Sequence, residues 1–178
     1  PIEDRELPPY PEAPAELPPE ERRRIAIVGA GPTGLTAGHF LARMGYQVTI
    51  FEALPVAGGM ARVGIPAYRL PRDVLNREID EILSLGVQLK LNHPIRDVNK
   101  LFDEGFSATF LAIGAHEPQK LRIPGEDEAK GMFHGVPFLR AVALGEEVPM
   151  GDRVVVVGGG NTAVDTARTA RRLGSRQV

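Results

Sequence analysis

The chain has 178 residues, 43% of them apolar, and a formal net charge of only −2. This length suffices for one ordinary domain or for parts of two. The near-neutral charge and the scattered Lys and Arg residues argue against nucleic acid or an anionic membrane surface as a partner. No apolar run approaches the roughly 18 residues that a membrane-spanning helix needs. We therefore expect a soluble, cytoplasmic protein that does not bind membranes.

The sequence contains no cysteine. This chain therefore forms no disulfide, has no thiolate nucleophile and ligates no iron–sulfur cluster of the usual four-cysteine kind. Any cluster that the intact system uses must be bound by other polypeptide. The histidines show no spacing typical of a metal site, and we expect none in this chain. They are His39, His93, His116 and His134.

Residues 1–23 hold seven of the sixteen prolines, mixed with acidic residues. Such a segment cannot sustain a helix or a central strand, because proline lacks the backbone N–H and fixes its own φ. We therefore expect residues 1–23 to form an extended arm.

Residues 24–52, RIAIVGAGPTGLTAGHFLARMGYQVTIFE, have the pattern of one βαβ dinucleotide-binding unit. A short apolar strand leads into Gly29, which permits a tight turn. Gly31 lets the backbone approach a pyrophosphate, and Gly34 lets the following helix pack closely on the sheet. Glu52 ends the second strand, where a carboxylate accepts hydrogen bonds from the hydroxyls of the adenosine ribose.

A second pair of glycines, Gly58–Gly59, begins six residues after Glu52. Another close approach of glycine backbone fits a cofactor longer than the βαβ crevice alone can hold, although a plain flexible loop has the same composition. Together with Glu52, this pair favours FAD over NAD at the first site.

Apolar periodicity and turn residues predict how the chain continues. The expected elements are a helix at 71–85, a strand at 87–91 and a buried strand at 106–115. Pro71 suits the first turn of this helix, and Gly86 ends it. Residues 116–150 are interrupted by Pro and Gly and form a crossing segment, so a domain boundary is expected near residues 115–125.

Residues 153–178, RVVVVGGGNTAVDTARTARRLGSRQV, have the pattern of the start of a second unit. They align with the first unit without a gap at an offset of 129 residues, which places Gly158, Gly160 and Ala163 at the three glycine positions. Alanine is an accepted variant at the third position. The equivalent of Glu52 would be residue 181, so the second-strand residues that select NADH or NADPH lie outside the chain.

Four arginines near the end of this segment admit two interpretations. Arg168, Arg171, Arg172 and Arg176 could contact a 2′-phosphate, but the first three also lie late in the expected helix, where cations favourably meet the helix dipole. Because the second unit lacks its second strand, we interpret the chain as a fragment of a longer protein. We expect the fastest hydrogen exchange in residues 153–178.

Several segments together resemble the FAD- and NAD(P)-binding part of the glutamate synthase small subunit. They are VGAGPTGL, FE, AGGMARVGIPAYRLP, FLAIGA and VVVVGGGNTAVD, and the resemblance runs from about Arg24 to Val178. Similar proteins are the flavin-containing half of dihydropyrimidine dehydrogenase, ferredoxin-linked NAD(P) transhydrogenases and adrenodoxin-type ferredoxin reductases. The resemblance implies an α/β fold in which a Rossmann-like FAD-binding domain (24–120) precedes a crossover and the beginning of a second Rossmann-like, NAD(P)-binding domain (121–178).

The resemblance also implies the site residues. Those expected to line the FAD are Gly29, Gly31, Pro32, Gly34, Glu52, Gly58, Gly59, Met60, Ile95, Ala112 and Gly114, with Gly64 and Ile65 near its ring system. Those expected to meet the pyrophosphate of NADP or NAD are Gly158, Gly160, Asn161, Thr162 and Ala163. No catalytic acid, base or nucleophile is expected, because the flavin carries the chemistry.

The activity that the resemblance implies is electron transfer from NADPH or NADH through FAD to iron–sulfur clusters on another domain or subunit, such as a large synthase subunit. The full-length parent is thus expected to be an enzyme. Two alternatives stay open: a ferredoxin–NAD(P) reductase or transhydrogenase module, and a non-catalytic FAD-binding fragment whose nicotinamide site is incomplete. A disulfide reductase is excluded for this chain, because it has no Cys-x-x-Cys pair.

Overall fold

The computed structural model describes residues 23–178. The predicted Pro-rich arm at 1–23 lies outside the described residues, apart from its last residue.

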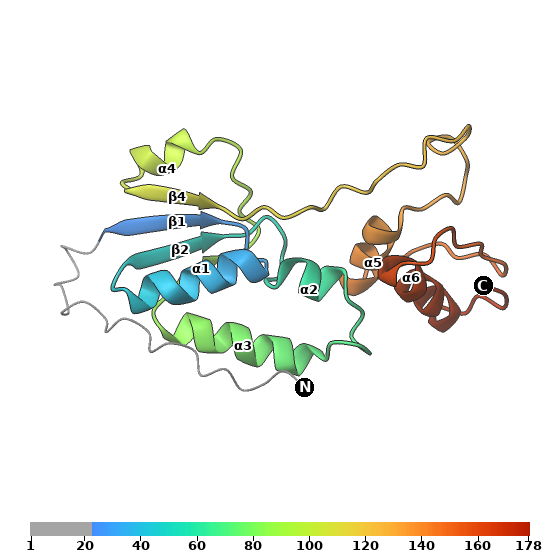
Figure 1. Cartoon of the computed structure of the whole chain (residues 1–178), viewed down its shortest axis with the longest axis horizontal. Coiled ribbons are helices and arrows are strands. Elements are labelled where there is room, and N and C mark those ends of the chain that lie inside the picture. The colour runs from blue at the N-terminus through green and yellow to red at the C-terminus, as the bar shows by residue number, and fades with distance from the viewer. Residues whose placement is uncertain (1–22) are drawn as a thin grey trace.

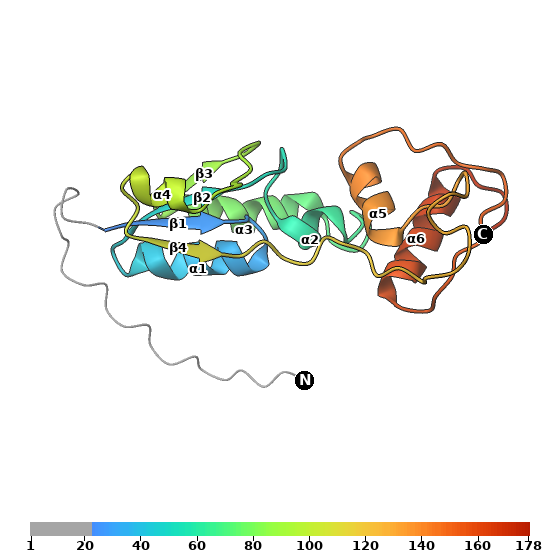
Figure 2. The ribbon, with the colours of Figure 1, turned by 90° about the horizontal axis from the view of Figure 1, so that it is seen from above.

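Four parallel strands form a sheet in the first part of the chain (Figures 1 and 2). They are β1 (Arg24–Val28), β2 (Gln47–Phe51), β3 (Gln88–Lys90) and β4 (Ala108–Leu111). Their order is β3-β2-β1-β4, so β1 has β2 on one side and β4 on the other. In open α/β sheets, ligands bind outside the carboxyl ends of the strands where the strand order reverses. The fold therefore places a binding crevice between the ends of β1 and β4.

Helices cover both faces of this sheet. They are α1 (Pro32–Arg43), α2 (Gly59–Val63), α3 (Arg72–Ser84) and α4 (Asn99–Asp103). Ile27 and Ile50 point to the face that α1 and α3 cover, whereas Val28 and Phe51 pack with Leu101 of α4 on the opposite face. This alternation is the period of two that a strand imposes, and it gives two apolar cores on one sheet. Figure 2 shows α1 and α4 on opposite sides of β1.

The predicted helix at 71–85 is confirmed as α3, and Pro71 immediately precedes its first residue. Gly86, with φ of +88°, ends the helix. The predicted strand at 87–91 is confirmed as β3. The five-residue helix α2 was not predicted, because the Gly- and Pro-rich segment that contains it has no apolar periodicity.

The strand predicted at 106–115 forms as β4, but the prediction that it is buried is wrong. Within the described residues, β4 pairs only with β1 and stands at an edge of the sheet. Its side chains Phe110 and Leu111 are consequently exposed. An apolar strand is buried only when other elements pack along both of its edges. In the described part of the chain, β4 has a neighbouring strand on one edge only.

The second part of the chain consists of a crossing segment and two helices, α5 (Gly135–Ala143) and α6 (Asn161–Arg172). The helix α5 forms inside the predicted crossing segment. Phe138 and Leu139 of α5 pack on Ala170 of α6 and make a third, small core. Figures 1 and 2 show the extended crossing chain that leads from β4 to this helix pair.

The strand predicted for VVVV at 154–157 is wrong for the described residues. Only one isolated parallel bridge forms there, between Arg153 and Gln177. The exposed fractions of Val155 and Val157 are 88% and 70%. In the first unit, β1 and β2 begin with Arg24 paired to Gln47. Adding the offset of 129 predicts that Arg153 pairs with residue 176, and the observed partner, Gln177, is one residue further along. An apolar segment forms a strand only when another strand pairs with it along its length. In the described residues, this segment has a single bridge.

Candidate dinucleotide-binding sites

A cavity of about 290 Å³ lies at the carboxyl ends of β1, β2 and β4. Nine of the residues predicted for the FAD line it, from five separate segments of the chain. They are Gly29, Gly31, Pro32, Glu52, Gly59, Met60, Ile95, Ala112 and Gly114. The fold thus gathers at the predicted crevice residues that are up to 85 positions apart in sequence, counted from Gly29 to Gly114.

Gly29 makes the turn that opens this cavity. Its φ is +108°, a conformation that side chains of L-residues rarely adopt, and a Cβ there would lie 2.3 Å from the Ala112 carbonyl oxygen. Its N–H donates to the Phe51 carbonyl at 2.7 Å, which carries the pairing of β1 and β2 one step beyond the strands. Gly34 sits behind the turn, where a Cβ would lie 1.9 Å from the Gly29 carbonyl oxygen. Gly34 therefore packs the helix rather than lining the cavity.

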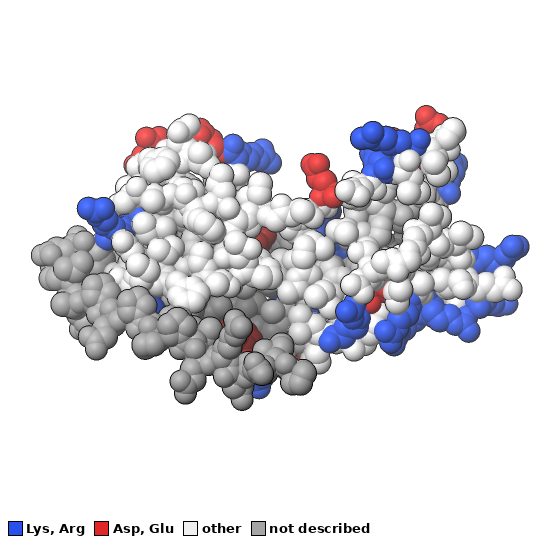
Figure 3. Space-filling model, in the orientation of Figure 1, with Lys and Arg blue, Asp and Glu red and all other residues white. Residues whose placement is uncertain are grey.

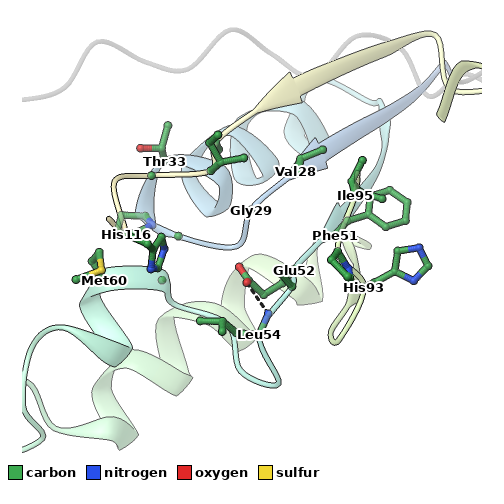
Figure 4. A pocket seen from close by; sticks show the side chains of 18 of the residues that line it. Val28, Gly29, Thr33, Phe51, Glu52, Leu54, Met60, His93, Ile95 and His116 are labelled. Carbon is green, nitrogen blue, oxygen red and sulfur yellow. Dashed lines mark hydrogen bonds between the residues drawn. The ribbon is translucent and has the colours of Figure 1, made fainter. Parts of the chain in front are cut away.

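Glu52 is buried at the base of the cavity, with an exposed fraction of 7%. One carboxylate oxygen accepts the N–H of Ala30 at 2.8 Å. The other accepts the N–H of Leu54 at 2.8 Å, which Figure 4 shows as a dashed line. Each oxygen retains lone-pair capacity for a further donor. The carboxylate thus holds the glycine turn and the end of β2 together, in addition to facing the cavity as predicted.

The second glycine pair packs directly on the first turn. The N–H of Gly58 donates to the Ala30 carbonyl at 2.8 Å, and a Cβ on Gly59 would lie 2.6 Å from the Cα of Gly31. These contacts show that the second glycine pair packs closely on the first turn and is not a plain flexible loop. Its close approach to a cofactor stays a prediction. Gly58 and Gly64 do not line this cavity, and Ile65 lines a different one.

Sequence reasoning missed several residues of the cavity wall. They are Val28, Thr33, Phe51, Ala53, Leu54, His93, Pro94, Ile113, His116 and Arg140. Figure 4 shows His116 beside Met60, across the cavity from Phe51, His93 and Ile95. Most of these residues neighbour a predicted one and could have been found from it. Arg140 comes from α5, and no local pattern indicates that this helix reaches back to the sheet.

A second cavity, of about 380 Å³, lies at the N-terminus of α6. Four of the five residues predicted for the nicotinamide dinucleotide line it, and Gly158 does not. They are Gly160, Asn161, Thr162 and Ala163. The first N–H groups of a helix have no partner within it and favour an anion. The opposite wall comes from the crossing segment and includes His134 and Leu121.

A buried carboxylate shapes the crossing segment beside this cavity. Glu126 accepts the N–H of Leu121 at 2.8 Å and that of Arg122 at 2.6 Å. The hydrogen bond from Leu121 is the largest of the influences that hold the pKa of Glu126 below its ordinary value, and His134 adds to it. The carboxylate therefore organises the loop that forms the wall.

Basic side chains gather over the α6 side of the molecule (Figure 3). Arg171 donates to the carbonyls of Ser175 and Arg176 at the end of the helix. Arg168 and Arg172 lie over the ring of Tyr68, at 4.7 and 3.9 Å from its centroid. These contacts favour the structural interpretation of the three helical arginines over a role in binding a 2′-phosphate.

No helix in residues 23–178 is long and apolar enough to cross a membrane. Within the same residues, no group of three or more His, Asp or Glu side chains is arranged to hold a metal ion.

Comparison with known proteins identifies relatives. The chain is 50% identical over 161 residues to the NADP(+)-dependent formate dehydrogenase subunit beta of Moorella thermoacetica, covering 88% of this chain and 23% of that protein. It is 37% identical over 170 residues to the glutamate synthase [NADPH] small chain of Escherichia coli K12, covering 88% and 36%. This match confirms the resemblance found in the sequence. The chain spans only about a quarter to a third of the length of these relatives.

Among solved structures, a 2-naphthoyl-CoA reductase complex is similar, with a TM-score of 0.72 and 27% identity over 92% of this chain and 24% of that one. The family of pyridine nucleotide-disulphide oxidoreductases matches residues 23–178. Members of this family bind FAD and NAD(P)H, in agreement with the two cofactors predicted. The two glycine-rich turns, the parallel sheet and this match show that the chain belongs to the pyridine nucleotide-disulphide oxidoreductase family.

Proposed function

We propose that this chain forms the dinucleotide-binding part of a flavoprotein oxidoreductase similar to the glutamate synthase small subunit. FAD would occupy the cavity at the ends of β1, β2 and β4, and a nicotinamide dinucleotide would occupy the cavity at the N-terminus of α6. The observation that carries the proposal is the convergence of nine predicted residues on the first cavity.

The first cavity has the chemistry that an adenine dinucleotide requires. Its glycine turn has no side chain at the positions nearest a pyrophosphate, and Glu52 offers a carboxylate to ribose hydroxyls. Ile95 and Met60 supply apolar wall, and Arg140 is a cation within reach of the cavity. The volume of about 290 Å³ is just below the range typical of ligand cavities, about 300–1,000 Å³. It suits part of a dinucleotide, with the remainder extending along the surface.

When bound, FAD supplies the acceptor for a hydride and can release electrons singly. The residues of this chain have simpler tasks. The turn at Gly29–Pro32 binds and orients the dinucleotide, Glu52 fixes its ribose, and the apolar wall at Ile95 and Met60 excludes water. We assign no acid, base or nucleophile to this chain.

We propose NADPH as the electron donor of the intact protein. The names of the formate dehydrogenase and glutamate synthase relatives specify NADP(+) and NADPH, which supports this choice over NADH. Arg168, Arg171 and Arg172 already have structural contacts, which supports other residues as those that bind the 2′-phosphate.

We further propose that electrons leave this part of the protein for iron–sulfur clusters on another domain or subunit. Both curated relatives are named as one subunit or chain of an oxidoreductase, which supports a partner polypeptide. The clusters must be bound outside these 178 residues, because the chain has no cysteine.

The test is the visible spectrum of the purified chain after addition of FAD and removal of the unbound cofactor. We expect a yellow protein with the perturbed absorbance of a bound flavin. The substitution Gly29→Ala should abolish binding, because its Cβ would overlap the Ala112 carbonyl oxygen. The matched control is Gly86→Ala, which shares the positive φ but has open space around it, and it should retain FAD. A colourless wild-type chain, or equal binding by both variants, would contradict the assignment of this cavity.

The electron-transfer step is tested on the full-length protein by anaerobic mixing with NADPH. Bleaching of the flavin absorbance supports the proposal. Bound FAD without bleaching by NADPH or NADH would favour a non-catalytic FAD-binding module. Bleaching followed by reduction of ferredoxin alone would favour a ferredoxin–NAD(P) reductase.

A further inference from the structure

Tyr68 and Arg69 contact helix α6, which lies almost one hundred residues further along the chain. We call the five side chains involved the α6 clamp: Tyr68 and Arg69 from the first part of the chain, and Asp165, Arg168 and Arg172 from α6. Neither proposed cofactor cavity includes Tyr68, Arg69 or Asp165 in its lining. The clamp therefore needs an explanation beyond cofactor binding.

The turn that carries Tyr68 and Arg69 is braced from within. The N–H groups of Arg69 and Leu70 donate to the Pro66 carbonyl at 2.9 and 3.1 Å. The guanidinium of Arg72 donates to the carbonyls of Ala61 and Ile65 at 3.2 and 2.9 Å. A turn with these hydrogen bonds holds the side chains of Tyr68 and Arg69 in a fixed direction. It can therefore fix the position of the helix that these side chains contact.

An ion pair joins this turn to α6. Arg69 donates to one carboxylate oxygen of Asp165 at 2.6 Å, and the side chain of Asp165 is only 4% exposed, against 40% for Arg69. In the part of the chain that the structure describes, the other carboxylate oxygen is buried without a hydrogen-bond partner. Loss of Arg69 would leave a buried carboxylate without its cation, which is strongly unfavourable.

Tyr68 adds a second contact on the same face of the helix. Its ring packs against the guanidinium groups of Arg168 and Arg172, an arrangement in which the ring face attracts the cations. Asp165, Arg168 and Arg172 are spaced by three and four residues, so they share one face of α6. The clamp thus fixes both the position of the helix and its rotation about its axis.

Apolar contacts between the first and second parts of the chain do not make the polar contacts of the clamp redundant. The helices α2 and α5 also meet, but a cavity of about 380 Å³ remains between the two parts. Its walls are Val63, Ile65, Pro66, Ala67, Tyr68 and Arg72 on one side, and Leu139, Val142, Ala143, Thr169, Arg172 and Leu173 on the other. Helix α6 packs on α5 through the third core, so what needs explanation is how this helix pair is held against the first part. Because the cavity separates part of the facing apolar surfaces, the polar contacts of the clamp add to the contact of α2 with α5 in holding the pair there.

We propose that Tyr68 and Arg69 are positioning residues that hold α6, and with it the cavity-lining end Gly160–Ala163, at a fixed place relative to the first cavity. Asp165 lies two residues beyond this end of the helix, so a shift of Asp165 moves the end with it. The consequence for electron transfer rests on the function proposed above, whereas the consequence for geometry does not.

The geometric test uses the absence of cysteine in the native chain. Spin labels attached at Glu78→Cys on α3 and Glu147→Cys after α5, both exposed positions, report the distance between the two parts by double electron–electron resonance. We expect a narrow distance distribution in the labelled chain and a clearly broader one after Arg69→Gln. Arg77→Gln is the matched control, because it removes the same charge from an exposed position on α3, and its distribution should stay narrow.

A charge exchange separates a specific role of the ion pair from misfolding. Asp165→Arg alone should broaden the distribution, and the pair Arg69→Asp with Asp165→Arg should narrow it again. An unchanged narrow distribution in Arg69→Gln would overturn the proposal. An exchanged pair that folds, by its circular dichroism, yet remains as broad as the single variants would overturn it as well.

The functional test uses flavin reduction by NADPH in the full-length protein. Arg69→Gln should slow the reduction by about 10- to 100-fold, because a displacement of about 1 Å between reacting groups has effects of this size. The dissociation constant of FAD should stay within about twofold of the wild-type value, since Arg69 does not line that cavity. A wild-type protein that binds no FAD would contradict the proposed function. The spin-label measurement would still show whether the α6 clamp holds α6 in place.

Discussion

Glu52 offers the sharpest test of how the first site is built. The substitution Glu52→Gln keeps the shape of the side chain and replaces one oxygen by an NH₂ group. Both carboxylate oxygens accept backbone N–H groups, those of Ala30 and Leu54, each at 2.8 Å. An amide has a single acceptor oxygen, so one of these N–H groups must face another donor.

The cost follows from that count. A hydrogen bond to a charged acceptor contributes about 1.5–3 kcal/mol, and a buried donor left without a partner costs about 1–3 kcal/mol. These contributions overlap, because they describe the same N–H group. We therefore expect the free energy of unfolding of the cofactor-free chain to fall by about 2–3 kcal/mol. The affinity for FAD should fall by about 10- to 100-fold, because a ribose hydroxyl also loses a charged acceptor.

Urea unfolding followed by circular dichroism measures the first effect. With an m-value of about 2 kcal/mol/M, the midpoint should move by about 1 M or more. Glu78→Gln is the matched control, since this exposed residue lies on α3 away from the cavity, and its midpoint should equal that of the wild type. If Glu52→Gln unfolded at the wild-type urea concentration, the carboxylate would not be holding the glycine turn, and the reasoning would be refuted.

Two further changes probe the second part of the chain. Gly135→Ala would place a Cβ 2.9 Å from the Thr162 Cγ2 and 3.2 Å from the Thr166 hydroxyl oxygen, so these side chains or the start of α5 must shift. We expect a loss of about 1–3 kcal/mol in stability and weaker NADP⁺ binding by calorimetry. The control Gly151→Ala meets only ordinary contacts and should leave both measurements unchanged, and equal behaviour of the two variants would contradict the expected clash. The second change is acidification: because the pKa of Glu126 is lowered in the fold, its stabilising contribution is complete above the ordinary value of 4.5 and disappears as the pH falls through the lower, folded value. Amide protection of Leu121 and Arg122 should fall on acidification in the wild type. The variant Glu126→Ala has no acceptor oxygen in its side chain and should already lack this protection at neutral pH. Protection that persists in the variant would show that the carboxylate does not order the crossing segment.

Local sequence pattern was sufficient for much of the first part of the chain. The periodicity of apolar residues predicted α1, α3 and the strands β1, β2 and β3, because each of these elements buries one face or stripe against its sequence neighbours. The glycine positions in the turn were also predictable, since Gly29 needs a positive φ that few other residues adopt. Family resemblance supplied Ile95, Ala112 and Gly114, which local pattern alone would not connect to the glycine turn.

The predictions that failed depended on partners distant in sequence. The run at 106–115 and the valines at 154–157 are apolar enough for buried strands, yet β4 stands at an edge and the valines form no strand in the described residues. Apolar composition reports what a segment could bury. It does not report whether another segment is present to cover it.

The sequence by itself determined which turns have the glycine pattern of a dinucleotide-binding unit, because glycine spacing, strand pattern and the position of Glu52 are local properties of the chain. Only the tertiary structure decided three contacts: Glu52 accepts a hydrogen bond from the glycine turn, Arg140 of α5 lines the first cavity, and Tyr68 and Arg69 contact α6. Each of these contacts joins residues at least twenty-two positions apart. Such pairs are brought together by the packing of whole elements, and no short window of sequence contains both partners.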